Sequence, residues 1–363
     1  MAADNQPSWQ KGVVVEAVPV ANEVQRIVLQ PERPQHARAG SHVDVSLQVD
    51  AHAVTRSYSV VRSEEGGRRL TLSVQLAPAS RGGSRHMHAL SVGDRIEMTQ
   101  PLQNFPLGVG AARYVLVAGG IGITALMAMA AVLRDREVDY DLVYVGRTRR
   151  VMPYLDQLAE EHGERFHLHV DDEGTPLDVD EVCDSVAQHE AAARTEMYVC
   201  GPIRLMDALR RSWLDHGLPA PSLRFEMFGN SGAWAAQDFV VRIPRLDKEV
   251  CVDANQSMLD ALEDAGVEVM WDCRKGECGL CAVKVLEVSG HVDHRDVFLD
   301  DNQKAASSTL CCCVSRVAQG ELSATELRDT TADSTPATAA TTTGPAHPNT
   351  DGHGPAVLTI DLP

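Results

Sequence analysis

The sequence predicts a multidomain protein in which an antiparallel β-barrel, an α/β domain and a small α+β domain follow one another. Short apolar runs separated by Pro, Gly and Asp turns fill residues 12–107, as in a small antiparallel barrel. A buried-type strand, a glycine turn and an apolar helix follow at 114–133, as in α/β domains. Three spaced cysteines at 273–281 then mark a third module. The length of 363 residues agrees with two or three domains.

Composition and charge restrict the partners and the compartment. The net charge of −18 argues against nucleic acid and against an anionic membrane surface as partners. Met1–Gln10 has neither a basic nor an apolar region of the kind that begins a signal peptide. Nine cysteines in a chain without such a leader fit a reducing compartment, so we expect a cytoplasmic protein. The uncharged stretch Tyr114–Leu133 is long enough for a membrane span, but three glycines divide it into strand, loop and helix.

The first module, residues 1–110, is expected to form the barrel. Its predicted strands are Val13–Val18, Gln25–Leu29, His42–Val49, Thr55–Val61 and Leu70–Leu76. In the fourth strand, alternation places Arg56 and Tyr58 on one face and Ser57 and Ser59 on the other. Taken alone, this tetrapeptide is more typical of an ordinary strand with an exposed Arg and a half-buried Tyr.

An anion-binding turn is predicted further along the barrel. Arg81, Gly82, Gly83 and Ser84 precede a helix or turn that runs to Leu90. Two glycines and a hydroxyl at a helix start can cradle an anion with backbone N–H groups and the positive end of the helix. The alternative is a simple loop of this composition.

The second module, residues 111–229, has the pattern of a nucleotide-binding domain. Gly120-x-Gly122-x-x-Ala125, which includes Thr124, follows a buried strand and opens a helix, as the dinucleotide fingerprint requires. After the next strand, Asp141–Val145, the rule expects an acid for the ribose 2′-hydroxyl of NAD. The sequence instead has an arginine cluster that begins at Arg147 and that could accept a 2′-phosphate, so NADH and NADPH both remain open.

A second turn at the same sheet edge is predicted at Cys200-Gly201-Pro202, directly after a strand. The carboxyl ends of parallel strands are where α/β sheets bind ligands. The alternative for Cys200 is a small buried apolar side chain. A linker at 230–237 then separates this module from the third, which spans 238–328.

The third module contains the loop Cys273-x4-Cys278-x2-Cys281, which is the spacing of a plant-type [2Fe–2S] site. Gly276 and Gly279 allow the backbone to wrap tightly around sulfur ligands. Zinc is the alternative, but a zinc ribbon favours two C-x2-C pairs. The fourth ligand is expected from the run Cys311-Cys312-Cys313. With Cys311 as that ligand, the gap after Cys281 would be shorter and nearer to that of ordinary plant-type ferredoxins.

The chain beyond residue 328 is expected to be a tail, 329–363, that is disordered over most of its length. Thr331–Gly354 is rich in Thr, Ala and Pro and lacks apolar periodicity. Val357–Leu362 is strand-like and is a candidate for the last strand of the third module. Gly320–Leu327 is an equal candidate for that strand.

These motifs, in this order, resemble the phthalate dioxygenase reductase family, which includes vanillate demethylase reductases. The resemblance covers about Gly12 to Leu322 and implies an FMN-binding barrel, a pyridine-nucleotide domain and a ferredoxin domain of β-grasp fold. It favours Cys313 as the fourth ligand beside Cys273, Cys278 and Cys281, because Cys313 opens Cys-Val-Ser-Arg. It also favours NADH over NADPH.

The resemblance also implies roles for individual residues. Arg56 and Ser84 would hold the FMN phosphate, Tyr58 would pack against the isoalloxazine, and Ser59 would hydrogen-bond near N5. Cys200 would lie beside the nicotinamide, and Phe225 and Glu226 would close the domain near the flavin. The catalytic candidates are thus Ser59, Cys200 and Glu226. The remaining cofactor-binding candidates are Ser57, Gly82, Gly83, Gly120, Gly122, Thr124, Arg147, Gly201 and Pro202.

The activity that the resemblance implies is electron transfer from NADH to FMN, then to the cluster, and then to a separate Rieske-type oxygenase. This chain has no Cys-x-His pairs of its own to bind a Rieske centre. The alternatives are a reductase for a cytochrome P450 and, from a different class, a flavin and iron–sulfur redox sensor. A sensor would need an output module, and none is visible.

Overall fold

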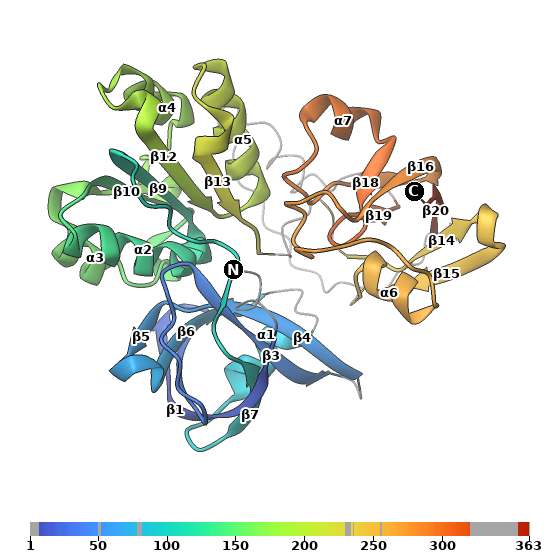
Figure 1. Cartoon of the computed structure of the whole chain (residues 1–363), viewed down its shortest axis with the longest axis horizontal. Helices are drawn as coiled ribbons and strands as arrows, with labels where there is room; N and C mark the ends of the chain where they lie inside the picture. The colour runs from blue at the N-terminus through green and yellow to red at the C-terminus, as the bar shows by residue number, and fades with distance from the viewer. Residues whose placement is uncertain are drawn as a thin grey trace, which may run out of the picture. The chain divides into compact units, whose positions relative to one another are not determined.

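The computed structural model describes residues 7–49, 52–77, 82–228, 234, 236–254, 256–319 and 355–362. The chain divides into two compact units, Met1–Phe228 and Gly229–Pro363, which are described separately (Figure 1). The first unit holds two sheets and the second holds the cysteine loop. Arg81 and the segments Gly320–Leu327 and Thr331–Gly354, for which the sequence made predictions, lie outside the described residues.

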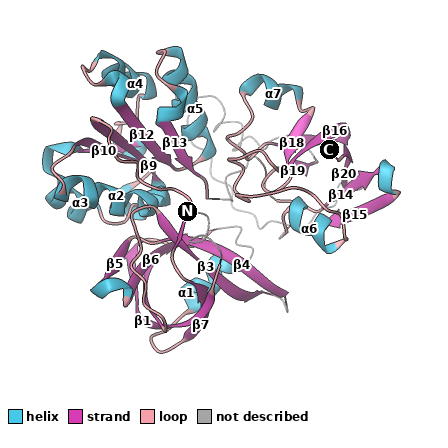
Figure 2. Cartoon of the chain, viewed as in Figure 1, coloured by secondary structure: helices cyan, strands magenta, loops and turns pink. Residues whose placement is uncertain are grey.

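An eight-stranded antiparallel sheet forms the first half of unit one, as predicted for a barrel. Its strands follow the order β4-β3-β7-β1-β2-β6-β5, and β8 pairs with β3. Figure 2 shows this part as mainly strand, with the short helix α1 (Gly83–Ala89) beside it. The strands are β1 (Trp9–Ala21), β2 (Val24–Pro31), β3 (Ser41–Val49), β4 (His52–Ser59), β5 (Arg62–Glu64), β6 (Arg69–Gln75), β7 (Arg95–Thr99) and β8 (Leu102–Gln103). Alternate apolar side chains such as Val43 and Val45 fill the interior.

A five-stranded parallel sheet of order β11-β10-β9-β12-β13 forms the second half of unit one. In Figure 1 the sheet lies between α2 and α3 on one side and α4 and α5 on the other. The strands are β9 (Arg113–Gly119), β10 (Asp139–Gly146), β11 (Phe166–Val170), β12 (Thr195–Cys200) and β13 (Leu223–Glu226). The helices are α2 (Ile123–Asp135), α3 (Leu155–His162), α4 (Val179–Gln188) and α5 (Ile203–Asp215).

The stretch of membrane-span length, Tyr114–Leu133, is divided between β9, a 3-10 turn and α2. Across the described residues, no helix is both long and apolar enough to cross a bilayer.

Polar contacts join the two sheets within unit one. The hydroxyls of Ser73 on β6 and Tyr154 beside α3 lie 2.6 Å apart. The N–H of Asn22, in the turn between β1 and β2, donates to the carbonyl of Arg150 at 2.8 Å. Val61, the second residue after the barrel strand β4, packs in the core of the α/β sheet. The ends of β4 and of the parallel strands are therefore held next to each other.

Unit two is built on a mixed sheet of order β15-β14-β20-β16-β18 and a smaller pair, β17 with β19. Its strands are β14 (Phe239–Ile243), β15 (Lys248–Val252), β16 (Ala282–Ser289), β17 (His291–Asp293), β18 (Thr309–Cys311), β19 (Arg316–Ala318) and β20 (Ala356–Asp361), and its helices are α6 (Met258–Asp264) and α7 (Asp301–Ala306). As predicted, the Ser257 hydroxyl caps α6 by accepting the N–H of Asp260 at 3.1 Å.

The strand predicted from Val357–Leu362 forms β20, which lies in the middle of this sheet. It runs parallel to β14 and antiparallel to β16. Ala356, Leu358 and Ile360 face the core and are no more than 1% exposed. The end of the chain therefore contributes a core strand to unit two.

A buried histidine gives unit one a pH-dependent stability. His162 Nδ1 lies 2.5 Å from the Tyr140 hydroxyl, and burial lowers the pKa of His162 below its ordinary 6.5. The unfolded chain then binds this proton more readily than the folded chain, so the stabilisation is complete above pH 6.5 and decreases as the pH falls below it. We expect His162→Gln to lower the melting temperature at about pH 7.5 and to do so less at about pH 5. If His162→Gln lowers the melting temperature by the same amount at both pH values, the assignment is contradicted.

Candidate functional site

Strand β4 carries the first group of candidate residues, and its two faces differ as predicted. Arg56 and Tyr58 are half-buried, and burial raises the pKa of Tyr58 to about 12 although the nearby Arg56 charge opposes this. Ser57 is exposed on the opposite face and donates to Asp44 Oδ1 at 2.5 Å. The structure therefore does not bring Ser57 together with Arg56 and Tyr58.

The glycine turn before α1 supports Arg56. A Cβ on Gly83 would lie 3.1 Å from Arg56 Cγ, so glycine leaves room for the arginine stem. Gly82 has a φ of +86°, which favours glycine. The hydroxyl of Ser84 accepts the N–H of Ala77 at 3.1 Å. Arg56 and the turn at 82–84 thus form one local group, as an anion site formed by the two motifs requires.

The three catalytic candidates lie at the junction of the two sheets. Ser59 at the end of β4 donates to Glu226 Oε2 at 3.4 Å, and both side chains are buried. Glu226 is also the register partner of Cys200 on the neighbouring strand, and Phe225 pairs with Val199. Residues 167 positions apart are therefore brought together at the carboxyl edge of the parallel sheet.

The glycine turn after β9 packs against the turn after β12. A Cβ on Gly122 would clash with the backbone carbonyl of Cys200, and one on Gly201 would lie 2.9 Å from Gly119 Cα. Gly120 differs, because its φ is +54° and a Cβ there would meet no atom within 4 Å. Its backbone is thus accessible at the sheet edge where a dinucleotide phosphate binds.

Other residues predicted at this edge have structural contacts of their own. The Thr124 hydroxyl donates to the carbonyl of Ile121 at 2.9 Å and is buried, so it closes the glycine turn. Cys200 is fully buried in the α/β core. Pro202 contacts Gly119, since a Cβ on that glycine would lie 2.6 Å from the proline ring. Arg147 is exposed at the carboxyl end of β10.

The four cysteines assigned as cluster ligands in unit two lie as two pairs. Cys281 Sγ and Cys313 Sγ are 3.1 Å apart, and the Cys273 thiol hydrogen-bonds that of Cys278. Within the part of the chain that the structure describes, no three His, Cys, Asp or Glu side chains converge on a single-ion site. A [2Fe–2S] cluster instead requires two thiolates on each of two irons, which is the arrangement that these pairs offer.

The loop backbone supports the sulfur atoms. The N–H of Lys275 donates to Cys273 Sγ at 3.4 Å. Gly276 has a φ of +75°, and a Cβ there would lie 2.9 Å from Asp296 Cα. A Cβ on Gly279 would clash with the ring of Phe298. Glycine is required at both positions because neighbouring atoms leave no room for a Cβ. The hydrogen bond from the Lys275 N–H to Cys273 Sγ is of the type that stabilises sulfur ligands of a cluster.

The three adjacent cysteines all reach Cys281 but are not equivalent. Hydrogen bonds from Cys311, Cys312 and Cys313 lower the pKa of the Cys281 thiol, and the pKa values of those three rise because they donate to it and are buried. Cys313 is the member of the run whose Sγ lies 3.1 Å from Cys281 Sγ, and the Cys273 charge of the other pair contributes to the rise in its pKa. The geometry therefore favours Cys313 over Cys311 for a site that joins both pairs.

A buried carboxylate behind the loop was missed by the sequence reasoning. Asp296 is fully buried, accepts the N–H of Leu299 at 2.8 Å and accepts the hydroxyl of Ser315 at 3.3 Å. Burial alone would raise its pKa, but hydrogen bonds from His294 and Leu299 outweigh it and lower the pKa. The N–H of Val297 donates to the carbonyl of Gly276 at 3.0 Å, so this segment holds the cysteine loop. In the sequence, the run of charged residues at 293–296 was the signal that could have indicated this carboxylate.

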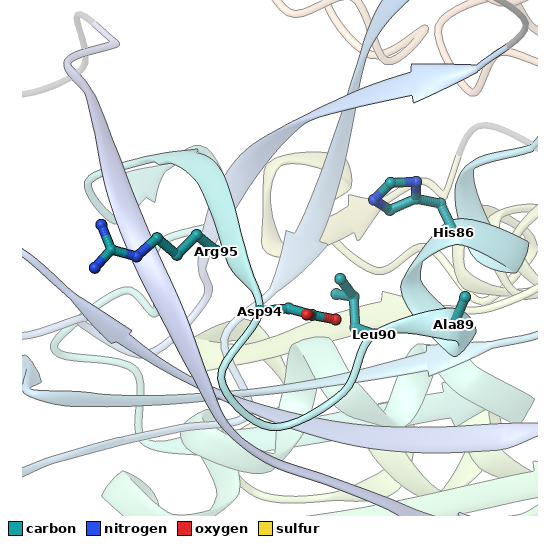
Figure 3. Close-up of a pocket in the computed structure, with 5 residues that line it drawn as sticks. All are labelled: His86, Ala89, Leu90, Asp94 and Arg95. Atoms are coloured by element: carbon teal, nitrogen blue, oxygen red, sulfur yellow. The ribbon is translucent and has the colours of Figure 1, made fainter.

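A shallow pocket of about 290 Å³ lies on the barrel, lined by His86, Ala89, Leu90, Asp94 and Arg95. Figure 3 shows Arg95 extending away from the other labelled side chains. The pocket thus lacks the convergent polar groups of a specific ligand site.

Comparisons with known proteins agree with this arrangement. Residues 11–106 match the family model "Oxidoreductase FAD-binding domain", and residues 241–318 match "2Fe-2S iron-sulfur cluster binding domain". The chain is 37% identical to tetrachlorobenzoquinone reductase of Sphingobium chlorophenolicum, over 84% of this chain and 94% of that protein. It is 37% identical to phenoxybenzoate dioxygenase subunit beta of Ectopseudomonas oleovorans, over 77% and 86%. The solved structure of phthalate dioxygenase reductase matches with a TM-score of 0.68 and 27% identity, over 98% of each chain.

Proposed function

Because the chain belongs to the phthalate dioxygenase reductase family, an oxidoreductase family with flavin and [2Fe–2S] modules, we propose that it delivers electrons from NADH to a separate Rieske-type oxygenase. The observation that carries this proposal is the presence, in one chain, of the Ser59–Glu226 junction and the two cysteine pairs. We place this activity in the cytoplasm, where NADH is supplied.

The residues present fit the groups that the family binds. Arg56 and the turn at 82–84 would hold the phosphate of FMN, with Tyr58 against the ring. Cys273, Cys278, Cys281 and Cys313 would hold the cluster. When bound, the flavin supplies the change from hydride transfer to single-electron transfer. The protein's own task is to position these groups and to exclude water, because no proton transfer by an acid–base pair is required.

In this proposal Glu226 orients the Ser59 hydroxyl at the flavin. We expect Glu226→Gln and Ser59→Ala each to slow flavin reduction by NADH about tenfold, or about 1.4 kcal/mol, with flavin content unchanged. The measurement is anaerobic stopped-flow bleaching of the flavin. Ser57→Ala is the matched control, because the Ser57 side chain is exposed and its hydroxyl donates to Asp44 rather than to Glu226. Equal slowing by Ser57→Ala would refute the role of the pair.

The relative that reduces tetrachlorobenzoquinone favours a second candidate, in which a small quinone accepts the electrons directly. Turnover with NADH and a series of acceptors separates the candidates. If reduction of cytochrome c depends on the cluster, a protein as the physiological acceptor is supported. If turnover with the quinone survives loss of the cluster, the second candidate, direct reduction of a small quinone, is supported. Steady turnover with either acceptor would also exclude the redox-sensor alternative.

A further inference from the structure

We propose that the ion pair between Arg149 and Glu173 sets the preference for NADH over NADPH by occupying the guanidinium that would otherwise bind a 2′-phosphate. The inference rests on the proposed function, because it concerns the nucleotide site of that reductase. Arg149 lies in the turn after β10, and Glu173 lies in the 3-10 turn Asp171–Glu173 after β11.

The position of these turns is that of the adenosine ribose. In the sheet, Val145 near the end of β10 is the register partner of Gly119, which directly precedes the glycine turn. In dinucleotide-binding domains the phosphates lie at that glycine turn, and the ribose lies at the end of the next strand. The turn from Arg147 to Arg150 starts at that strand end and would face the ribose substituent that distinguishes the two nucleotides.

The acidic turn is fixed beside the arginine turn by its backbone. The N–H of Asp172 donates to the carbonyl of Arg147 at 3.1 Å. Gly174 closes the turn with a φ of +75°, and the Thr175 hydroxyl accepts the N–H of Val170 at 3.0 Å. The carboxylates at 171–173 are therefore held at the end of the third strand, next to the strand end where the usual acid is missing.

Arg149 donates two hydrogen bonds to the Glu173 carboxylate. Its Nε donates to Oε1 at 2.6 Å, and its Nη2 donates to Oε2 at 2.9 Å. An arginine guanidinium binds phosphate through the same bidentate geometry. The Glu173 carboxylate and a phosphate therefore compete for the same N–H groups of the guanidinium. The hydrogen bond from Arg149 also lowers the pKa of Glu173, which remains ionised at neutral pH.

The remaining acids of the turn act in the same direction. Asp171 and Asp172 place further negative charge beside the site, which repels a 2′-phosphate. Carboxylates at this point also provide acceptors for the 2′-hydroxyl of NADH, as the acid after the second strand does in other domains. The arginine cluster that the sequence suggested as a 2′-phosphate site is thus countered by an acidic turn from the next strand.

The test compares binding of 2′,5′-ADP and 5′-AMP to the flavin-loaded protein by isothermal titration calorimetry. Glu173→Gln frees Arg149 while keeping the side-chain length, so we expect about fivefold tighter binding of 2′,5′-ADP and unchanged binding of 5′-AMP. The kcat/KM for NADPH should rise by a similar factor. Adding Arg149→Ala should abolish the gain, whereas adding Arg147→Ala to both proteins should leave the ratio of their 2′,5′-ADP affinities unchanged.

Two outcomes would overturn the proposal at different levels. If Glu173→Gln binds 5′-AMP normally but gains nothing for 2′,5′-ADP, or keeps its gain with Arg149→Ala, the ion pair does not set the preference. If the wild-type protein binds neither 5′-AMP nor NADH, the nucleotide site itself is wrongly assigned and the proposed function fails with it.

Discussion

Cys313→Ser is expected to lose the [2Fe–2S] cluster while retaining the flavin. Cys313 Sγ lies 3.1 Å from Cys281 Sγ, and as the assigned partner of Cys281 its loss would leave one iron with a single thiolate. Cytochrome c reduction by NADH should fall at least about a hundredfold, or about 2.7 kcal/mol, because the one-electron route is gone. Ferricyanide reduction directly from the flavin should be nearly unchanged. Iron and acid-labile sulfide analysis measures the loss.

Cys312→Ser is the matched control for this change. Cys312 is fully buried beside Cys313 and also reaches Cys281, so its replacement disturbs the same core without removing the assigned ligand. It should retain the cluster, and so should Cys311→Ser. If Cys311→Ser loses the iron and Cys313→Ser keeps it, then Cys311 is the fourth ligand.

A stop codon after Asp329 should unfold unit two. The truncation removes β20, which pairs with β14 on one side and β16 on the other. Leu358 and Ile360 are fully buried, and each such side chain contributes about 1.5–3 kcal/mol. With the backbone pairing lost on both sides, the total approaches the net stability of a domain, about 5–15 kcal/mol. Circular dichroism melting and iron content are the measurements.

A point substitution separates the strand from the rest of the removed segment. Leu358→Asp places a charge in the core and should reproduce most of the destabilisation. Thr359→Ser, at the neighbouring half-buried position, should melt within a few degrees of wild type. If the truncated protein keeps both its cluster and its melting temperature, β20 contributes nothing to the stability of unit two.

The sequence predicted the elements whose signals are local. Alternation identified β4 with Arg56 and Tyr58 on one face, glycine spacing identified the turn after β9, and cysteine spacing identified the cysteine loop. Ser257 predicted the start of α6 because an N-cap is a property of adjacent residues. These features need no information about distant parts of the chain.

Contacts between distant segments were not predictable in the same way. The bidentate bond between Glu173 and Arg149 joins the ends of two strands, and nothing in either local pattern indicates the other. The same holds for Asp296, whose burial depends on the cysteine loop that it supports. Helix α3 was also missed, since Tyr154 enters it with a φ of +68° that no residue-type rule anticipates.

The most direct test of the central claim is anaerobic mixing of the purified protein with NADH, followed by optical and electron paramagnetic resonance spectroscopy. We predict one flavin, two irons and two sulfides per chain, with flavin bleaching first and a [2Fe–2S] signal appearing after it. In Cys313→Ser the flavin should bleach at the wild-type rate with no such signal. Zinc in place of iron, or a cluster reduced at the wild-type rate in protein stripped of flavin, would contradict the account.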